Sequence, residues 1–268
     1  MFVDTHCHLN MLVKKEFDVL LTHDQIEAID AIVQEAYAAG VEKIINVGTS
    51  LPESINSVAI AKRYPTIFAT VGIHPCDATE SWYHDFKEIE TLVKNKEENK
   101  IVGVGEVGLD FYHKPFFRQR QEDAFKAHIE LAIEHQLPLS IHVRDAGDEL
   151  LEVLEPYVKN ITGAVIHCFS QNQQFATTVL EWGLYVGIDA PITYPKNELL
   201  RDIVRNIPLS HIILETDAPF LPPQEYRGKQ NRPAYIPLFA QTVADLKKVT
   251  LAVVQDVTTA NVKKLFRI

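Results

Sequence analysis

The sequence is poor in cysteine and lacks any long apolar run. Its three cysteines, Cys7, Cys76 and Cys168, are odd in number and widely spaced, which argues against a disulfide framework and favours a reducing compartment. No stretch reaches the roughly 20 apolar residues that a membrane span requires. The first residues show neither the basic segment nor the apolar segment of an export signal. We therefore expect a cytoplasmic protein without a membrane-spanning segment.

Positive charge is also scarce. The 268 residues include 26 Lys and Arg against 36 Asp and Glu, which gives a net charge of −10. Proteins that coat nucleic acid without sequence preference are usually basic, because neutralising phosphates supplies their affinity. The composition argues against such a protein. Any chemistry on nucleic acid would need local positive charge, from bound cations and a few Arg and Lys side chains.

Short apolar runs alternate with longer amphipathic stretches along the whole chain. The runs are rich in Val and Ile and nearly continuous in hydrophobicity, as expected of parallel strands covered on both faces. They are Phe2–Cys7, Val41–Val47, Ile67–Ile73, Ile101–Val107, Pro138–Val143, Gly163–Phe169, Leu184–Ile188 and Ile212–Leu214. Eight strand–helix units predict an α/β fold, a (β/α)8 TIM barrel, formed by a single domain over residues 1–268.

The stretches between the runs have helical patterns and plausible helix ends. Gln25–Ala39 is followed by Gly40 as a C-terminal cap, and Phe117–His135 is the longest such stretch. Asp145 is expected to cap a helix over Leu150–Tyr157. The alternative fold, a doubly wound open sheet, would ordinarily carry a Gly-rich phosphate turn after its first strand. This chain has His-Cys-His-Leu-Asn there, which favours the barrel.

Residue types that bind metals follow most of the predicted strands. In a (β/α)8 barrel the carboxyl ends of the strands surround one cup, so residues distant in sequence meet there. These residues are His6, His8, His74, Glu106, Asp110, His142, His167, Glu215 and Asp217. Because His6 and His8 are two residues apart on a strand, their rings point the same way and can share an ion. The clustering predicts a metal site at this end of the barrel.

Each of these residues alone has an ordinary structural interpretation. A single His142 or His167 is more often a buried core histidine, and a single Glu106 or Asp217 can form a structural ion pair. Six residues with unrelated structural roles would rarely fall by chance at matching strand ends, so a shared metal site explains the pattern better. Nitrogen and oxygen ligands without thiolates suit Zn, Mn or similar divalent ions.

The remaining cysteines and histidines near or outside the predicted strands have simpler expected roles. Cys7 and Cys168 each adjoin a candidate ligand and should face the opposite side of their strands as small packing residues. Six histidines are expected at the surface, namely His23, His84, His113, His128, His135 and His211.

Several blocks of sequence together resemble the TatD family of metal-dependent deoxyribonucleases. They come in the order of that family and cover nearly the whole chain. They are Phe2–Leu9 (FVDTHCHL), Val71–Pro75 (VGIHP), Gly105–Tyr112 (GEVGLDFY), Ile141–Arg144 (IHVR), Ile166–Ser170 (IHCFS), Leu214–Pro219 (LETDAP) and Tyr226–Asn231 (YRGKQN). One departure is Cys76, where many members have a histidine, and it affects only the role of that outer position.

The resemblance implies a nuclease or phosphodiesterase with two divalent cations, Zn, Mn or Mg. It makes His6, His8, Glu106 and Asp217 the ligands of one cation. Glu106, as a bridge, His142 and His167 would hold the other. Two close cations activate water for in-line displacement at phosphorus. We expect Glu106 and Asp217 to be the catalytic residues, with Asp217 as the general base for the attacking water.

Other polar residues near the predicted cup are candidates for binding substrate or for orienting ligands. Glu215 could orient groups behind the ligands. Arg144, Arg227 and Lys229 could hold phosphate, although solvated surface charge is an equally ordinary interpretation. His74, Asp110, Phe111 and Tyr112 should line the mouth, where aromatic rings can stack on bases. With an acidic exterior, the expected substrate is nucleic acid engaged as a single strand or at an end, with no obligate protein partner.

Two other functions remain compatible with the sequence. One is a hydrolase of a cyclic amide or ester on the same barrel. Many such enzymes bridge their metals with a carboxylated Lys on the fourth strand, where this chain has Glu106. The other is a metal-stabilised binding protein without activity, which is disfavoured because every expected ligand is present.

Overall fold

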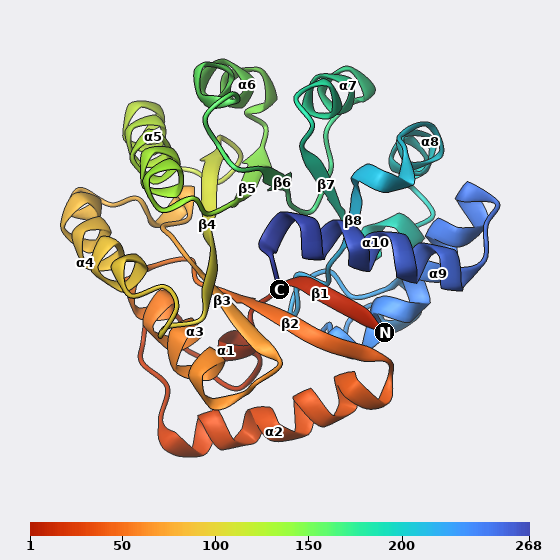
Figure 1. Ribbon diagram of the computed structural model, residues 1–268, viewed down its shortest axis with the longest axis horizontal. Coiled ribbons are helices and arrows are strands. Elements are labelled where there is room, and N and C mark those ends of the chain that lie inside the picture. The colour runs from red at the N-terminus through yellow and green to blue at the C-terminus, as the bar shows by residue number, and fades with distance from the viewer.

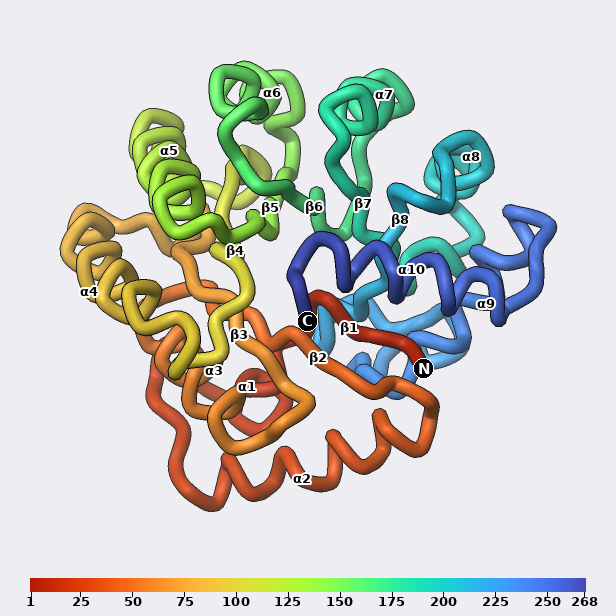
Figure 2. The backbone as a smooth tube through the Cα atoms, in the orientation of Figure 1, coloured from red at the N-terminus to blue at the C-terminus, as the bar shows by residue number.

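The structure, a computed structural model, describes residues 1–268 and contains one sheet of eight parallel strands in the order β1 to β8. Figures 1 and 2 show the strands at the centre, with the helices outside them. The strands are β1 (Phe2–Cys7), β2 (Val41–Val47), β3 (Ile67–Val71), β4 (Ile101–Asp110), β5 (Leu139–Arg144), β6 (Ala164–Ile166), β7 (Tyr185–Ile188) and β8 (Ile212–Leu214). The predicted (β/α)8 barrel in a single domain is confirmed.

Ten α-helices and six short 3-10 helices connect or follow the strands. The α-helices are α1 (Leu9–Leu12), α2 (His23–Ala38), α3 (Leu51–Arg63), α4 (Trp82–Lys94), α5 (Arg118–His135), α6 (Gly147–Leu154), α7 (Gln173–Glu181), α8 (Glu198–Asn206), α9 (Ile236–Lys247) and α10 (Leu251–Phe266). The Thr22 and Gln25 side chains form a reciprocal capping box at the start of α2. No helix is both long enough and apolar enough to cross a membrane.

The barrel closes between its first and last strands at the end where the predicted ligands lie. Cys7 and Ala218 form a parallel β-bridge, and the His8 amide donates to the Ala218 carbonyl at 2.8 Å. The buried Asp4 carboxylate reinforces this seam, because it accepts from the Thr216 hydroxyl at 2.6 Å and from the Thr216 amide at 3.0 Å. This closure fixes β1 beside the loop that follows β8.

Helix α10 covers the opposite end of the barrel. It crosses near both chain termini in Figure 1, and its Thr259 hydroxyl donates to the Met1 carbonyl at 3.1 Å. Leu265 and Phe266 of this helix pack with buried residues of the strands in a nine-residue cluster that includes Val3 and Ile213. Apolar side chains therefore fill the barrel interior at this end, which leaves the carboxyl ends of the strands for polar chemistry.

The predicted elements differ from the structure mainly at their ends. β4 runs three residues past the predicted Val107, and β6 ends at Ile166, so that His167 stands just beyond its strand. The expected cap at Asp145 is wrong. Helix α6 begins at Gly147 after Ala146 and has no side-chain cap, while Asp145 adopts a left-handed conformation with φ of 52°.

Candidate metal centre

The two histidines at the end of β1 aim the same ring atom at one point. The His8 Nδ1 atom donates to the Val47 carbonyl at 3.0 Å, and the His6 Nδ1 atom lies 3.2 Å from the Ser140 hydroxyl. The two Nε2 atoms lie 3.2 Å apart, and both rings are buried. Because Nδ1 of His8 is the donor, Nε2 of neutral His8 carries a lone pair that faces the centre of the site.

Glu106 lies at the centre of the cluster. One of its oxygens, Oε1, lies 2.9 Å from Nε2 of His167 and 3.0 Å from Nδ1 of His142. The other, Oε2, lies 3.3 Å from Nε2 of His6 and 3.7 Å from Nε2 of His8. One carboxylate thus faces two pairs of histidines, which is the arrangement required of a bridging ligand.

Strands β4 and β5 approach each other closely beside this carboxylate because Gly108 lacks a side chain. A Cβ atom at Gly108 would lie 2.0 Å from the His142 carbonyl oxygen, and its φ of +143° is one that other residues rarely adopt. This close approach of the two strands at Gly108 places His142 beside Glu106. The Nε2 atom of His142 lies 3.0 Å from Oδ2 of Asp110, at the end of β4.

Glu215 lies behind His167 on the side away from Glu106. Its Oε1 atom accepts a hydrogen bond of 2.5 Å from the Cys168 amide and lies 3.6 Å from Nδ1 of His167. Gly187 on β7 leaves the space for this carboxylate, because a Cβ atom there would meet Oε1 at 2.3 Å. Glu215 is thus placed to orient the His167 ring, as its position in the sequence had suggested.

Asp217 completes the cluster from the loop after β8. Its Oδ1 atom lies 3.3 Å from Nε2 of His8 and 3.8 Å from Nε2 of His6. Its side chain is 13% exposed, against 5% for Glu106. Asp217 is therefore the more open of the two carboxylates, and it faces the cavity above the cluster.

Opposing charges shape the acid–base properties of the cluster. Burial raises the pKa of Glu106, but the surrounding histidines, led by His167, outweigh it and hold this pKa well below 4.5. Burial lowers the pKa of His167, but the Glu106 charge raises it well above 6.5. Burial and the neighbouring His142 lower the pKa of His74 to about 3. Carboxylates that stay ionised among histidines form a site that attracts cations.

The donor set fits a divalent cation. Ligand atoms of His6, His8 and Glu106 lie within 4.8 Å of one another, as do those of His74, Glu106 and His142. The His8 lone pair faces a carboxylate and a second imidazole in a buried space, an arrangement that needs positive charge at its centre. Neutral imidazoles with carboxylates and no thiolate suit Zn, Mn and similar ions.

A cavity of about 1010 Å³ opens above the cluster. Its wall includes the candidate substrate residues His74 and Arg144, and the Arg144 guanidinium lies 3.9 Å from the Tyr112 ring. Arg227 and Lys229 are exposed residues that lie outside this wall. Arg227 reaches it only indirectly, with its guanidinium 4.5 Å from the ring of Tyr194. The structure thus brings together the six predicted ligands, His74 and Arg144.

Several expectations about individual residues were wrong. Asp110 is fully buried and holds His142 instead of lining the mouth. His113 is exposed, as expected, and its Nδ1 atom also lies 2.9 Å from Oδ2 of Asp110. His128 is buried within α5, and Cys168 lines the cavity because β6 ends before it. Cys7 is buried as a packing residue, as expected.

Asp189 is a cavity residue that sequence reasoning missed. It directly follows β7, is 1% exposed, and its Oδ2 atom has no hydrogen-bond partner. Burial, with the nearby charge of Glu215, raises its pKa well above 3.8. Its place directly after a strand was the available signal, since Asp110 and Glu215 also stand at strand ends.

Comparison with known proteins agrees with this geometry. A family model described as TatD related DNase matches residues 3–267. The chain belongs to this family. A TatD protein of Citrobacter rodentium, named a 3'-5' ssDNA/RNA exonuclease, is 37% identical over 259 residues, covering 94% of this chain and 97% of that protein. The metal-dependent hydrolase YabD of Bacillus subtilis is 32% identical over 268 residues, covering 100% of both chains.

Solved structures of the TatD family have the same fold. The crystal structure of YjjV, a TatD homologue from Escherichia coli K12, has a TM-score of 0.90 with 28% identity and covers 100% of this chain and 98% of that one. A lactonase from Deinococcus radiodurans has a TM-score of 0.65 with 13% identity, covering 99% and 95% of the two chains, and shows the fold alone. This chain is thus a TatD-family metal-dependent hydrolase, as the sequence blocks had predicted.

Proposed function

We propose that this protein is a nuclease that hydrolyses phosphodiester bonds of single-stranded nucleic acid from its end, and that it works in the cytoplasm. The observation that carries the proposal is the position of Glu106: Oε2 faces the buried His6 and His8, and Oε1 faces the buried His167 and the half-buried His142. The name of the Citrobacter TatD protein supports single strands and the 3' end as the point of attack. Three free cysteines agree with a reducing compartment.

The proposed ligands form two sets that share Glu106. His6, His8 and Asp217 complete the first set, and His142 and His167 complete the second. Divalent cations bound there would polarise the phosphodiester and lower the pKa of the attacking water. The close approach of His74 to Glu106, 3.6 Å from Nε2 to Oε1, puts His74 at the edge of the second set, where it would contact a phosphate oxygen.

The remaining steps belong to side chains of this protein. Asp217 accepts the proton of the attacking water on its carboxylate, which faces the cavity. Burial raises the pKa of Asp217, but the surrounding histidines outweigh burial and lower this pKa below its usual value. Arg144 binds a phosphate of the strand at the rim, where its fork can make paired hydrogen bonds. The buried histidines exclude bulk water below the scissile bond.

An amide or ester hydrolase on the same barrel is the second candidate. The likeness to a lactonase reflects the fold alone. Glu106 in place of a carboxylated Lys, and the Arg–Tyr contact at the rim, favour nucleic acid.

One experiment separates these functions. The purified protein is assayed for metal content, then tested on single- and double-stranded DNA and RNA and on ester and amide panels, with and without chelator. We expect chelator-reversible release of nucleotides from single strands, and its loss in Glu106→Ala. Turnover of esters or amides without any release of nucleotides would refute the proposal.

A further inference from the structure

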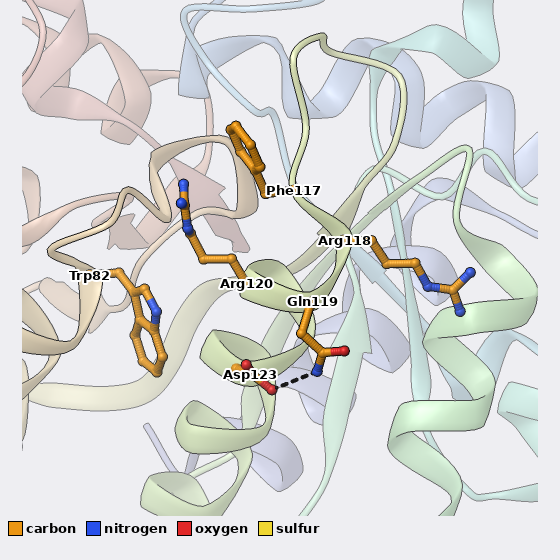
Figure 3. Close-up of a pocket in the computed structure, with 6 residues that line it drawn as sticks. All are labelled: Trp82, Phe117, Arg118, Gln119, Arg120 and Asp123. Carbon is orange, nitrogen blue, oxygen red and sulfur yellow. Dashed lines mark hydrogen bonds between the residues drawn. The ribbon is translucent and has the colours of Figure 1, made fainter.

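A second hollow lies outside the cup, between the starts of α4 and α5. It has a volume of about 530 Å³, and its walls include Trp82, Phe117 and Arg120. Figure 3 shows Arg120 beside Phe117 and facing Trp82, whereas Arg118 points away from them. We call the hollow formed by Trp82, Phe117 and Arg120 the α4–α5 groove.

The groove combines an exposed aromatic ring with a guanidinium. Phe117 is 55% exposed, and the Arg120 guanidinium lies 4.4 Å from the centre of its ring. The one acidic partner of Arg120, Glu80, lies 3.4 Å away and is 90% exposed, so this surface pair is weak and easily replaced. An open ring beside a cation is the arrangement with which proteins hold a base and its phosphate.

The loop between β4 and α5 links the groove to the metal centre. Asp110, which holds His142, also accepts hydrogen bonds from the amides of Tyr112 and His113 at the start of this loop. Tyr112 belongs to this loop, and the guanidinium of Arg144, in the cavity wall, lies over its ring. Arginine–aromatic contacts therefore run from the cup to the groove along one segment.

Charge identifies the partner of this segment. Residues 111–120 contain three basic residues, Lys114, Arg118 and Arg120, and no acidic one, a local charge of +3 in a chain of net charge −10. Arg118 is engaged by Glu122 and Glu149, and Asp123 accepts from Gln119 at 2.9 Å. Lys114 and Arg120 thus remain for a polyanion, at a place where the rest of the exterior would repel one.

We propose that the α4–α5 groove binds a nucleotide of the single strand whose end is held at the metal centre. The inference rests on the proposed nuclease function. The base stacks on Phe117, its phosphate pairs with Arg120, and the half-buried Trp82 forms the far wall. A strand long enough to span both sites gains affinity, whereas a dinucleotide confined to the cup does not.

The test compares a dinucleotide with a single strand of about twelve nucleotides, a length within the range that single-strand binding sites cover. In the metal-loaded protein, Phe117→Ala should raise KM for the longer strand about tenfold, the effect of losing one stacked base. The substitution should leave kcat for the longer strand and KM for the dinucleotide unchanged. Phe117→Trp should restore KM for the longer strand. Arg120→Gln should reduce the slope of log KM against log salt by about 0.7.

Tyr37→Ala is the matched control, since Tyr37 is 63% exposed and belongs to α2, which Figure 1 shows apart from α4 and α5. Equal KM values of the unaltered protein for both substrates would overturn the inference while leaving the nuclease intact. An equal effect of Phe117→Ala on KM for both substrates would also overturn the inference. So would light scattering that shows a dimer of the unaltered protein but a monomer of Phe117→Ala, because a second copy would then occupy the groove. Failure to cleave either substrate would refute both proposals.

Discussion

The Oδ2 atom of Asp110 lies 3.0 Å from the Nε2 atom of His142. This contact turns the other ring nitrogen, Nδ1, toward Glu106 at 3.0 Å. A buried carboxylate behind a ligating histidine fixes the ring and makes it a better ligand. Asp110 is therefore a positioning residue that acts on the proposed metal site through His142.

Asp110→Asn should weaken metal binding by about 10- to 100-fold, because the amide holds the ring without the negative charge. Competition with a chromogenic chelator measures this directly. Asp24→Asn at the exposed start of α2 is the control. Unaltered metal affinity in Asp110→Asn would show that the carboxylate is only structural.

Asp217→Asn should separate proton transfer from the binding of metal. The amide cannot accept a proton from water, so kcat should fall by about 10²- to 10⁴-fold, the usual contribution of a general base. His6, His8 and Glu106 remain to hold the cation, so metal content by mass spectrometry of the native protein should fall much less. Near-normal turnover with full metal content would eliminate Asp217 as the base.

Asp4→Ala should destabilise the barrel at its closing seam. The substitution leaves two buried donors, the Thr216 hydroxyl and the Thr216 amide, without an acceptor, at a cost on the order of 3 kcal/mol. Thermal unfolding measures the loss. Thr216→Val should cost less in the Asp4→Ala background than alone, because the two residues share these bonds. Additive losses would contradict the coupling.

His128 should make the protein less stable in acid. Burial lowers the pKa of His128 from 6.5 to about 4, and its Nε2 atom has no partner. As pH falls below about 6.5, the unfolded chain takes up a proton that folded His128 refuses until about pH 4. The stability present above pH 6.5 is thus lost over this window, on the order of 3 kcal/mol.

The measurement for His128 is the change in unfolding free energy between about pH 7 and about pH 4, compared with His128→Gln. The variant keeps a polar side chain in α5 but cannot titrate, so its stability should fall less over the same window. The histidines of the metal centre titrate equally in both proteins and cancel. Equal pH slopes would show that His128 does not contribute.

The ends of β1, β2 and β8 could be predicted from the sequence, because a strand buried on both faces needs a continuous run of apolar residues. The bridging place expected for Glu106 came from the resemblance to the TatD family. The ends of helices that begin in loops could not be predicted from apolar runs in this way. The Asp145 prediction failed because its left-handed backbone is set by the turn into α6, not by its own cap propensity. His128, by contrast, lies three or four residues from Phe125, Ala124 and Ala132, and this helical spacing of apolar residues could have predicted its burial.

The sequence determined the barrel, because the hydrophobicity of each strand is a local pattern. Its blocks that resemble the TatD family pointed to the candidate metal ligands, which the fold brings together at the strand ends. Tertiary structure decided which polar residues face which. It turned Asp110 inward to His142, placed Asp189 in the cavity wall and left Arg227 and Lys229 outside it. These outcomes depend on the approach of segments far apart in the chain, such as β4 to β5 at Gly108, and no local pattern encodes that distance.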